Sequence, residues 1–278
     1  MELKRLASDM ASLYNQNPKV EAVLLGGSVA RGWDDAFSDI ELFVLWKEEP
    51  TDEDRKAPIH NVNGSIIDFY PYEDEEWSET YIANGVKLEI SNFLTDTIYN
   101  VIEDVIIKGD IGFDKQCLVA TIHDGIALTG EKTVDRLQEK VAFYPDTLRE
   151  AMIIENIDLG NRWNNREALL DRKDWLMLYR IMVDTQTKIM ALLFGLNRVY
   201  VHHPAFKWQK RSLELMKVVP DRIAERLDEV FQHHPIDGIT ELELIIEEVY
   251  KLVRHDGVNV DMTEEVKRSQ FLRPKQTK

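Results

Sequence analysis

Two acidic residues interrupt a segment that is otherwise apolar, and this feature constrains the fold more than any other in the sequence. Residues 39–46 read Asp-Ile-Glu-Leu-Phe-Val-Leu-Trp, and apolar side chains on both faces predict a buried central strand rather than an edge strand with two solvated acids. Asp39 and Glu41 stand at i and i+2, so their carboxylates project from one face about 6 to 7 Å apart. Burying two such anions is costly unless cations compensate them.

The kind of cation follows from the ligands. Carboxylate oxygens with no Cys or His nearby select Mg²⁺ or Mn²⁺ over Zn²⁺, and the single cysteine of the chain, Cys117, excludes a multi-Cys zinc site. Two ions about 3.5 to 4 Å apart would clamp the attacking and leaving oxygens of a phosphoryl displacement. Asp39 and Glu41 are therefore predicted metal ligands.

A glycine-rich turn precedes this pair. Residues 22–25 predict a short buried strand that ends in Gly26-Gly27-Ser28, eleven residues before Asp39. A strand that passes through such a turn into a helix brings bare backbone N–H groups and a hydroxyl together, which suits an anion. Arg31 follows, and it either faces a phosphate or forms an ion pair with Asp34 or Asp35.

Hydrophobic periodicity predicts an α+β protein: an N-terminal domain over residues 1–130, with a mixed sheet and flanking helices, and a C-terminal all-α helical bundle over 131–278. In the first domain we expect strands at 22–25, 40–46, 66–70 and 86–91, helices at 3–14 and 96–108, and a surface loop at 47–56. In the second we expect helices from 145 onward and at 175–196, 211–218, 221–231 and 241–253.

Charge separates the same two halves. Residues 1–130 carry 25 acidic and 10 basic side chains, while 131–278 carry 25 and 24. The net charge of −16 disfavours a polynucleotide partner. The chain lacks a long apolar run and its N-terminus lacks the apolar core of a signal peptide, so we expect a cytoplasmic protein with no membrane partner.

The spacing of Gly-Gly-Ser and Asp-Ile-Glu resembles the signature of the nucleotidyltransferase superfamily, whose fold is that of the DNA polymerase beta palm. The resemblance covers roughly residues 20 to 92. It implies that Asp39 and Glu41 are paired metal ligands and that Gly27 and Ser28, with Gly26 beside them, contact a triphosphate. Glu41 departs from the commoner Asp at the second ligand.

The resemblance also implies a third carboxylate on a later strand. Asp68 is the expected one, because it alone interrupts the apolar run at 66–70, and Glu89 is the reserve. The acceptor further needs a general base, for which Asp68, Glu89, Asp158 and Asp174 are the candidates.

The helical second half resembles the small-molecule branch, similar to aminoglycoside and lincosamide nucleotidyltransferases. This implies transfer of a nucleoside monophosphate, AMP from ATP, to a hydroxyl of a small molecule, with two Mg²⁺ or Mn²⁺ ions, release of pyrophosphate and a possible homodimer. The alternatives are adenylylation of a protein or RNA end, and a non-catalytic, antitoxin-like nucleotide-binding module.

A basic segment stands out in the second half. Residues 185–213 contain no acid, and Lys207 lies there between Phe206 and Trp208. Lysine serves as a point-charge phosphate ligand, so Lys207 is predicted to bind the nucleotide. The alternative is a helix-loop-helix with solvated lysines.

Overall fold

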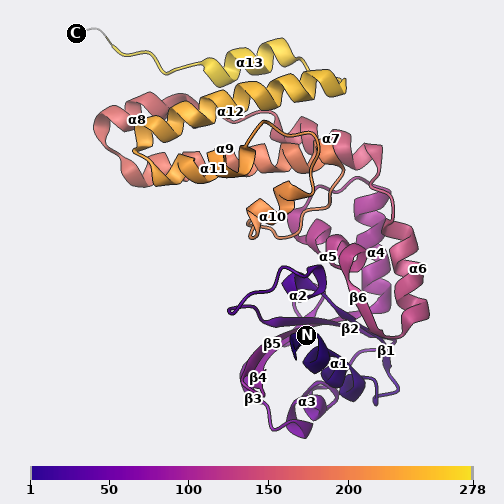
Figure 1. Ribbon diagram of the computed structural model, residues 1–278. Coiled ribbons are helices and arrows are strands. Elements are labelled where there is room, and N and C mark those ends of the chain that lie inside the picture. Colours follow the sequence, from indigo (N-terminus) through magenta and orange to yellow (C-terminus); the bar gives the residue numbers. More distant parts are fainter. Residues whose placement is uncertain (1, 277–278) are drawn as a thin grey trace. The chain divides into compact units, whose positions relative to one another are not determined.

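The computed structural model describes residues 2–276, and the chain divides into two compact units (Figure 1). Unit 1 contains residues up to 107 and residues 117–143, whereas unit 2 contains 108–116 and the chain from 144 onward. Unit 1 is a mixed sheet with helices and unit 2 is helical, so the predicted α+β class is confirmed. None of the described helices has the length and apolar character needed to cross a membrane.

Unit 1 holds the sheet. Its elements in chain order are α1 (Glu2–Tyr14), β1 (Val20–Leu25), α2 (Gly27–Arg31), β2 (Ile40–Trp46), α3 (Asp52–Asn61), β3 (Ser65–Phe69), β4 (Trp77–Ala83), β5 (Val86–Leu94), α4 (Thr95–Ile106), α5 (Phe113–Asp124), β6 (Ile126–Thr129) and α6 (Glu131–Val141). Helix α5 begins in unit 2 and continues into unit 1. The sequence interpretation placed no element at β4, α5, β6 or α6, and it missed α3.

The strand order decides which side chains meet. The described strands form one sheet in the order β3-β4-β5-β2-β1-β6. Strands β2 and β5 run parallel, and every other neighbouring pair is antiparallel. Because β4 and β5 form a hairpin inserted between β2 and β3, the strand that follows β2 in the sequence is not its neighbour in the sheet.

The two faces of the sheet differ. Helices α1 and α3 cover one face, and Figure 1 shows them on the side opposite α4 and α6. We call the face covered by α1 and α3 the inner face. It buries Ile40, Leu42 and Val44 of β2 against Met10 and Tyr14 of α1. The alternation of strand side chains then turns Asp39, Glu41 and their cross-strand neighbours to the outer face.

One predicted loop is a helix. Residues 47–56 were expected to form a surface loop because they are charged and contain proline, but α3 begins at Asp52. The Thr51 hydroxyl accepts a hydrogen bond from the Asp54 N–H (3.2 Å), and the Asp54 carboxylate accepts one from the Thr51 N–H (2.8 Å). This capping box satisfies two backbone donors that would otherwise lack partners. The cluster of acids is thus the first turn of a helix.

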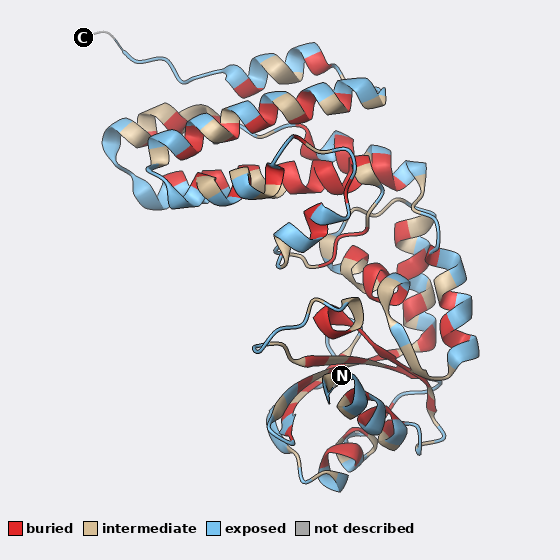
Figure 2. Ribbon diagram, in the orientation of Figure 1, coloured by how far each residue is buried: buried red, intermediate tan, exposed pale blue. Residues whose placement is uncertain are grey.

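Unit 2 consists of helices and loops. Its elements are α7 (Asp146–Asn156), a 3-10 helix η1 (Trp163–Asn165), α8 (Arg166–Arg172), α9 (Trp175–Asn197), α10 (Gln209–Glu214), α11 (Ile223–Gln232), α12 (Pro235–Asp256) and α13 (Met262–Gln270). Helix α9 contacts α7, α8 and α12. Its residues 189–196, near the C-terminal end, are buried throughout (Figure 2). Leu176, near its start, is 90% exposed. The first half of α9 is buried on one side only, at Leu178, Ile181 and Met182, whereas residues 189–196 are buried all round.

Candidate functional site

The outer face of the sheet brings three carboxylates together. Asp39 directly precedes β2 and Glu41 lies on it, while Glu89 lies opposite Glu41 on the parallel strand β5. Neighbouring strands lie about 4.8 Å apart, so Glu41 and Glu89 are direct cross-strand neighbours. The side chain of Asp39 is 18% exposed and that of Glu89 is 46% exposed. The set is open to solvent on one side and backed by the sheet.

A lysine lies among these acids. The Lys87 ammonium is 3.2 Å from the Asp39 carboxylate and also contacts the Glu89 carboxylate. Its hydrogen bond to Glu89 is the main reason that the pKa of Lys87 is raised. Sequence reasoning missed Lys87, although Lys87-Leu88-Glu89 repeats the alternation of Asp39-Ile40-Glu41 on another strand. Two polar side chains at i and i+2 in an apolar strand were the available signal.

Asp68 does not lie beside the pair. Along one row of the outer face, Asp68 pairs with Thr80, Thr80 pairs with Glu89, and Glu89 pairs with Glu41. Three strand spacings of about 4.8 Å put the backbone of Asp68 about 14 Å from that of Glu41. The third carboxylate is expected on a strand beside the pair, but β4 and β5 lie between β3 and β2. The structure therefore brings Glu89, the reserve candidate, to the position expected for Asp68.

The glycine-rich turn packs directly against Glu41. Gly27 has φ +62°, a left-handed value that favours glycine, and a Cβ added there would lie 2.2 Å from Glu41 Oε1. The Gly26 N–H donates a hydrogen bond to the Glu41 carbonyl oxygen (2.9 Å), and a Cβ on Gly26 would lie 2.6 Å from the Phe43 ring. Close approach to β2 therefore explains both glycines.

Ser28 joins the turn to the loop before β2. Its side chain is buried, and its hydroxyl lies 3.3 Å from the Ser38 hydroxyl. The Ser38 hydroxyl in turn accepts a hydrogen bond from the Asp35 N–H (2.9 Å). Asp35 therefore takes part in hydrogen bonds within the loop that precedes β2.

Arg31 forms an ion pair with a residue far along the chain. Its Nε lies 2.8 Å from the Asp124 carboxylate at the end of α5, not against Asp34 or Asp35. The Arg31 side chain is 7% exposed, and its Nη2 has no hydrogen-bond partner among the described residues. Asp124 also bonds His123 Nδ1 (2.6 Å), and this bond is the main cause of the raised pKa of His123.

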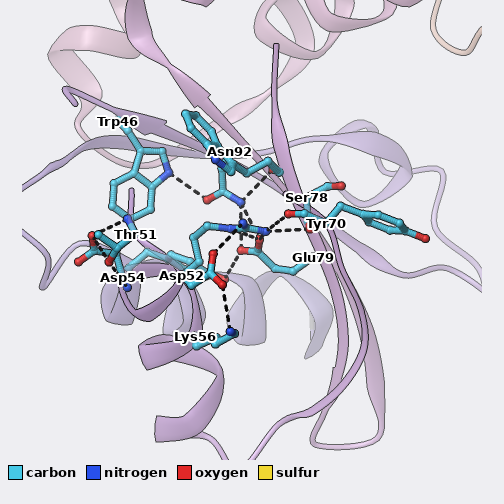
Figure 3. A network of polar contacts seen from close by, with 12 residues as sticks. Trp46, Thr51, Asp52, Asp54, Lys56, Tyr70, Ser78, Glu79 and Asn92 are labelled. Carbon is cyan, nitrogen blue, oxygen red and sulfur yellow. Dashed lines mark hydrogen bonds and ion pairs between the residues drawn. The ribbon is translucent and has the colours of Figure 1, made fainter. Parts of the chain in front are cut away.

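A buried polar network lies on the inner face of the same strands (Figure 3). The Glu79 carboxylate accepts hydrogen bonds from Arg55 Nε (2.8 Å) and Asn92 Nδ2 (3.0 Å), and Trp46 Nε1 donates to Asn92 (2.9 Å). Arg55 and Glu79 have fully buried side chains. Burial raises the pKa of Glu79 to about 7, against the opposing effect of Arg55. This network joins α3, β4, β5 and β2 on the inner face of the sheet.

Lys207 lies in unit 2, in the loop before α10. Phe206 and Trp208 on either side have φ values of +52° and +63°. The Phe206 ring contacts Phe113 (5.3 Å between centroids) and Phe194 (5.5 Å), which fixes the loop, while Lys207 itself is exposed. Desolvation and the charge of Lys207 lower the pKa of His203.

The remaining base candidates also lie in unit 2. Asp158 follows α7 and is 3.8 Å from Arg268, and Asp174 precedes α9. Within residues 2–276, no group of three or more His, Cys, Asp or Glu side chains is arranged to hold a metal ion.

Comparisons with known proteins cover the chain unevenly. Residues 111–209 match a family described as a domain of unknown function, DUF4037. That segment runs from just before α5 to the start of α10 and contains none of the three carboxylates. No curated protein matches the chain.

Among solved structures, the chain is similar to a nucleotidyltransferase-like protein from Exiguobacterium sibiricum 255-15. The similarity covers 91% of this chain and 75% of that one, at 10% identity and a TM-score of 0.41.

Proposed function

We propose that this chain is a metal-dependent nucleotidyltransferase that moves a nucleoside monophosphate, AMP from ATP, to a hydroxyl of a small-molecule acceptor. The observation that carries the proposal is the set of Asp39, Glu41 and Glu89 on neighbouring parallel strands, with the Gly27 backbone against the Glu41 carboxylate. Because Gly27 has no side chain, the backbone of the turn lies against the Glu41 carboxylate. A phosphate bound to this turn would therefore lie beside an ion bound to Glu41.

The donors fit Mg²⁺ or Mn²⁺ in kind, since all three side chains offer carboxylate oxygens, although the described side chains are not arranged around one ion. A positive charge is already favoured there, because the Lys87 ammonium lies between Asp39 and Glu89. The three carboxylates would have to turn toward a common point, and Lys87 holds two of them. When bound, the ion supplies neutralisation of the developing phosphate charge.

In the proposed reaction the acceptor oxygen forms a bond to the α-phosphorus while the bond from that phosphorus to the leaving pyrophosphate breaks. The acceptor hydroxyl proton passes to a general base. Asp39, Glu41 and Glu89 would bind the ion, and Gly26, Gly27 and Ser28 would contact the triphosphate. Asp68 stays a candidate for the base only for an acceptor that extends along the outer face, because its backbone lies about 14 Å from that of Glu41.

The test measures pyrophosphate release with ATP, Mg²⁺ and a panel of aminoglycosides, lincosamides and sugars. Glu89→Gln is expected to lower turnover by at least ~10²-fold, as loss of a metal ligand does, and Asp68→Asn less. Nucleotide binding without turnover on small molecules, proteins or RNA would instead support the non-catalytic module. Turnover only with a protein or RNA acceptor would support the other alternative.

The proposed nucleotide contact of Lys207 has its own test. Its loop is fixed by aromatic packing, whereas Lys210 lies on the first turn of α10, and both side chains are exposed. Lys207→Ala is expected to weaken binding of a non-hydrolysable ATP analogue by roughly 2 to 3 kcal/mol, and Lys210→Ala by under ~1 kcal/mol. Calorimetric titration measures both, and equal small effects would contradict the assignment.

A further inference from the structure

Lys87 occupies a special place on the outer face of the sheet. It lies on β5 two residues before Glu89, so its side chain projects from the same face. Its ammonium contacts oxygens of both Asp39 and Glu89. Asp39 directly precedes β2 and Glu89 lies on β5, so the lysine links the start of β2 to β5 through charge.

The surrounding charges explain why a cation is held there. Glu41 and Glu89 stand directly opposite each other on parallel strands, and like charges in that relation destabilise a sheet. Asp39 adds a third negative charge on the same face. One ammonium offsets part of this repulsion and leaves the cluster net negative.

The same oxygens cannot serve an ammonium and a divalent ion equally well. A divalent ion within about 4 Å of Lys87 Nζ would be repelled by the ammonium, because the effective dielectric at a protein surface screens the two charges only in part. The Lys87 side chain is 45% exposed, and four methylene groups let its head move into water while its stem stays on the sheet.

We propose that Lys87 is an internal counter-ion that competes with the divalent cation for Asp39 and Glu89 and swings outward when that cation binds. This rests on the proposed function, because it takes the metal site from there. Lys87 is a positioning residue: it holds the carboxylates at one face and sets how much free metal is needed to load the site.

The experiment follows Mn²⁺ binding by electron paramagnetic resonance and thermal stability in EDTA, with no substrate present. Lys87→Gln is expected to bind Mn²⁺ about tenfold more tightly, because one competing charge is gone, and to melt at a lower temperature in EDTA. Lys87→Arg keeps the charge and adds bidentate geometry, so it is expected to bind Mn²⁺ no more tightly than the wild type. This second variant also tests the idea if Lys87→Gln does not fold.

A matched control is Lys56→Gln, which removes a half-buried lysine paired with Asp52 at 3.3 Å in the same unit and should leave Mn²⁺ affinity unchanged. Asp39→Asn separates the two proposals. If Asp39→Asn does not reduce the Mn²⁺ binding of the wild type, or if the wild type binds no Mn²⁺, the metal site and the proposed function fail. If Asp39-dependent binding is present but Lys87→Gln binds Mn²⁺ equally or more weakly, the counter-ion role is overturned and the proposed function stands.

Discussion

Two glutamates on adjacent strands, Glu79 on β4 and Glu89 on β5, occupy opposite faces of one sheet. The Glu79 side chain is fully buried and receives hydrogen bonds from Arg55 and Asn92, whereas the Glu89 side chain is 46% exposed and contacts Lys87. A buried charge needs fixed partners, because each unmet hydrogen bond there is costly. A half-exposed charge can exchange its partner for an ion or for water. The inner face thus fixes the strands, whereas Glu89 on the outer face holds a charge that can exchange its partner.

The largest expected effect is at the fixed partner on the inner face. Arg55→Ala leaves Glu79 buried without its cation, and it should reduce the free energy of unfolding by about 3 to 5 kcal/mol. Urea denaturation measures this loss. Lys56→Ala, on the same helix, removes a more exposed ion pair and should cost under ~1 kcal/mol. Equal losses would contradict the distinction between the two faces.

On the outer face, substitution of a carboxylate is expected to lower activity rather than stability. Asp39→Asn and Glu41→Gln are each expected to reduce turnover by at least ~10²-fold, while the melting temperature in EDTA holds or rises because repulsion among the acids is relieved. Steady-state kinetics and calorimetric melting together check this. Near wild-type turnover in both variants would show that these carboxylates do not bind a catalytic ion.

Metal and nucleotide together should stabilise the protein more than either alone. The three outer-face carboxylates supply only part of an ion's coordination, and phosphate oxygens would complete it. The melting temperature with Mg²⁺ and a non-hydrolysable ATP analogue should therefore exceed the sum of the separate shifts. A full shift with Mg²⁺ alone would indicate a structural ion instead.

Substitution of Gly27 in the turn should have a smaller effect on stability, and Gly32 provides the control. Gly27→Ala meets both an unfavourable φ and the Glu41 carboxylate, while Gly32, at φ +70°, has nothing within 4 Å of an added Cβ. We expect Gly32→Ala to cost about 1 kcal/mol and Gly27→Ala about 1 to 3 kcal/mol more. Chemical denaturation measures both, and equal costs would show that the contact with Glu41 relaxes freely.

The smallest expected effect concerns the helix that carries Arg55. Although desolvation opposes it, hydrogen bonding by Thr51, Asn17 and Lys19 lowers the pKa of Asp54 to about 2, from an ordinary value near 3.8. A lowered pKa means that the stabilisation is present above pH 3.8 and is lost as the pH falls through 2. Asp54→Ala should cost about 1 kcal/mol at pH 7. Urea denaturation at pH 7 and pH 2 should show the difference from wild type shrinking in acid.

Local features of the sequence were predictable. The helix of residues 3–14 and the strand of residues 40–46 follow from periodicity alone, and α1 and β2 have nearly those bounds. The turn at Gly26-Gly27-Ser28 was predictable because two glycines and a serine directly follow an apolar strand. In contrast, α3 was missed because its acidic first turn reads as a loop unless the reciprocal cap of Thr51 and Asp54 is recognised.

The sequence by itself determined that Asp39 and Glu41 share one face, since alternation along a strand is a property of the backbone. Only the tertiary structure decided which acid joins them. Glu89 lies beside Glu41 because β5 pairs with β2, and Asp68 lies at the far edge because the β4 and β5 hairpin is inserted between. Likewise Arg31 meets Asp124, 93 residues away. Alternation is fixed by neighbours in the chain, whereas strand order depends on how apolar faces from distant segments are buried together.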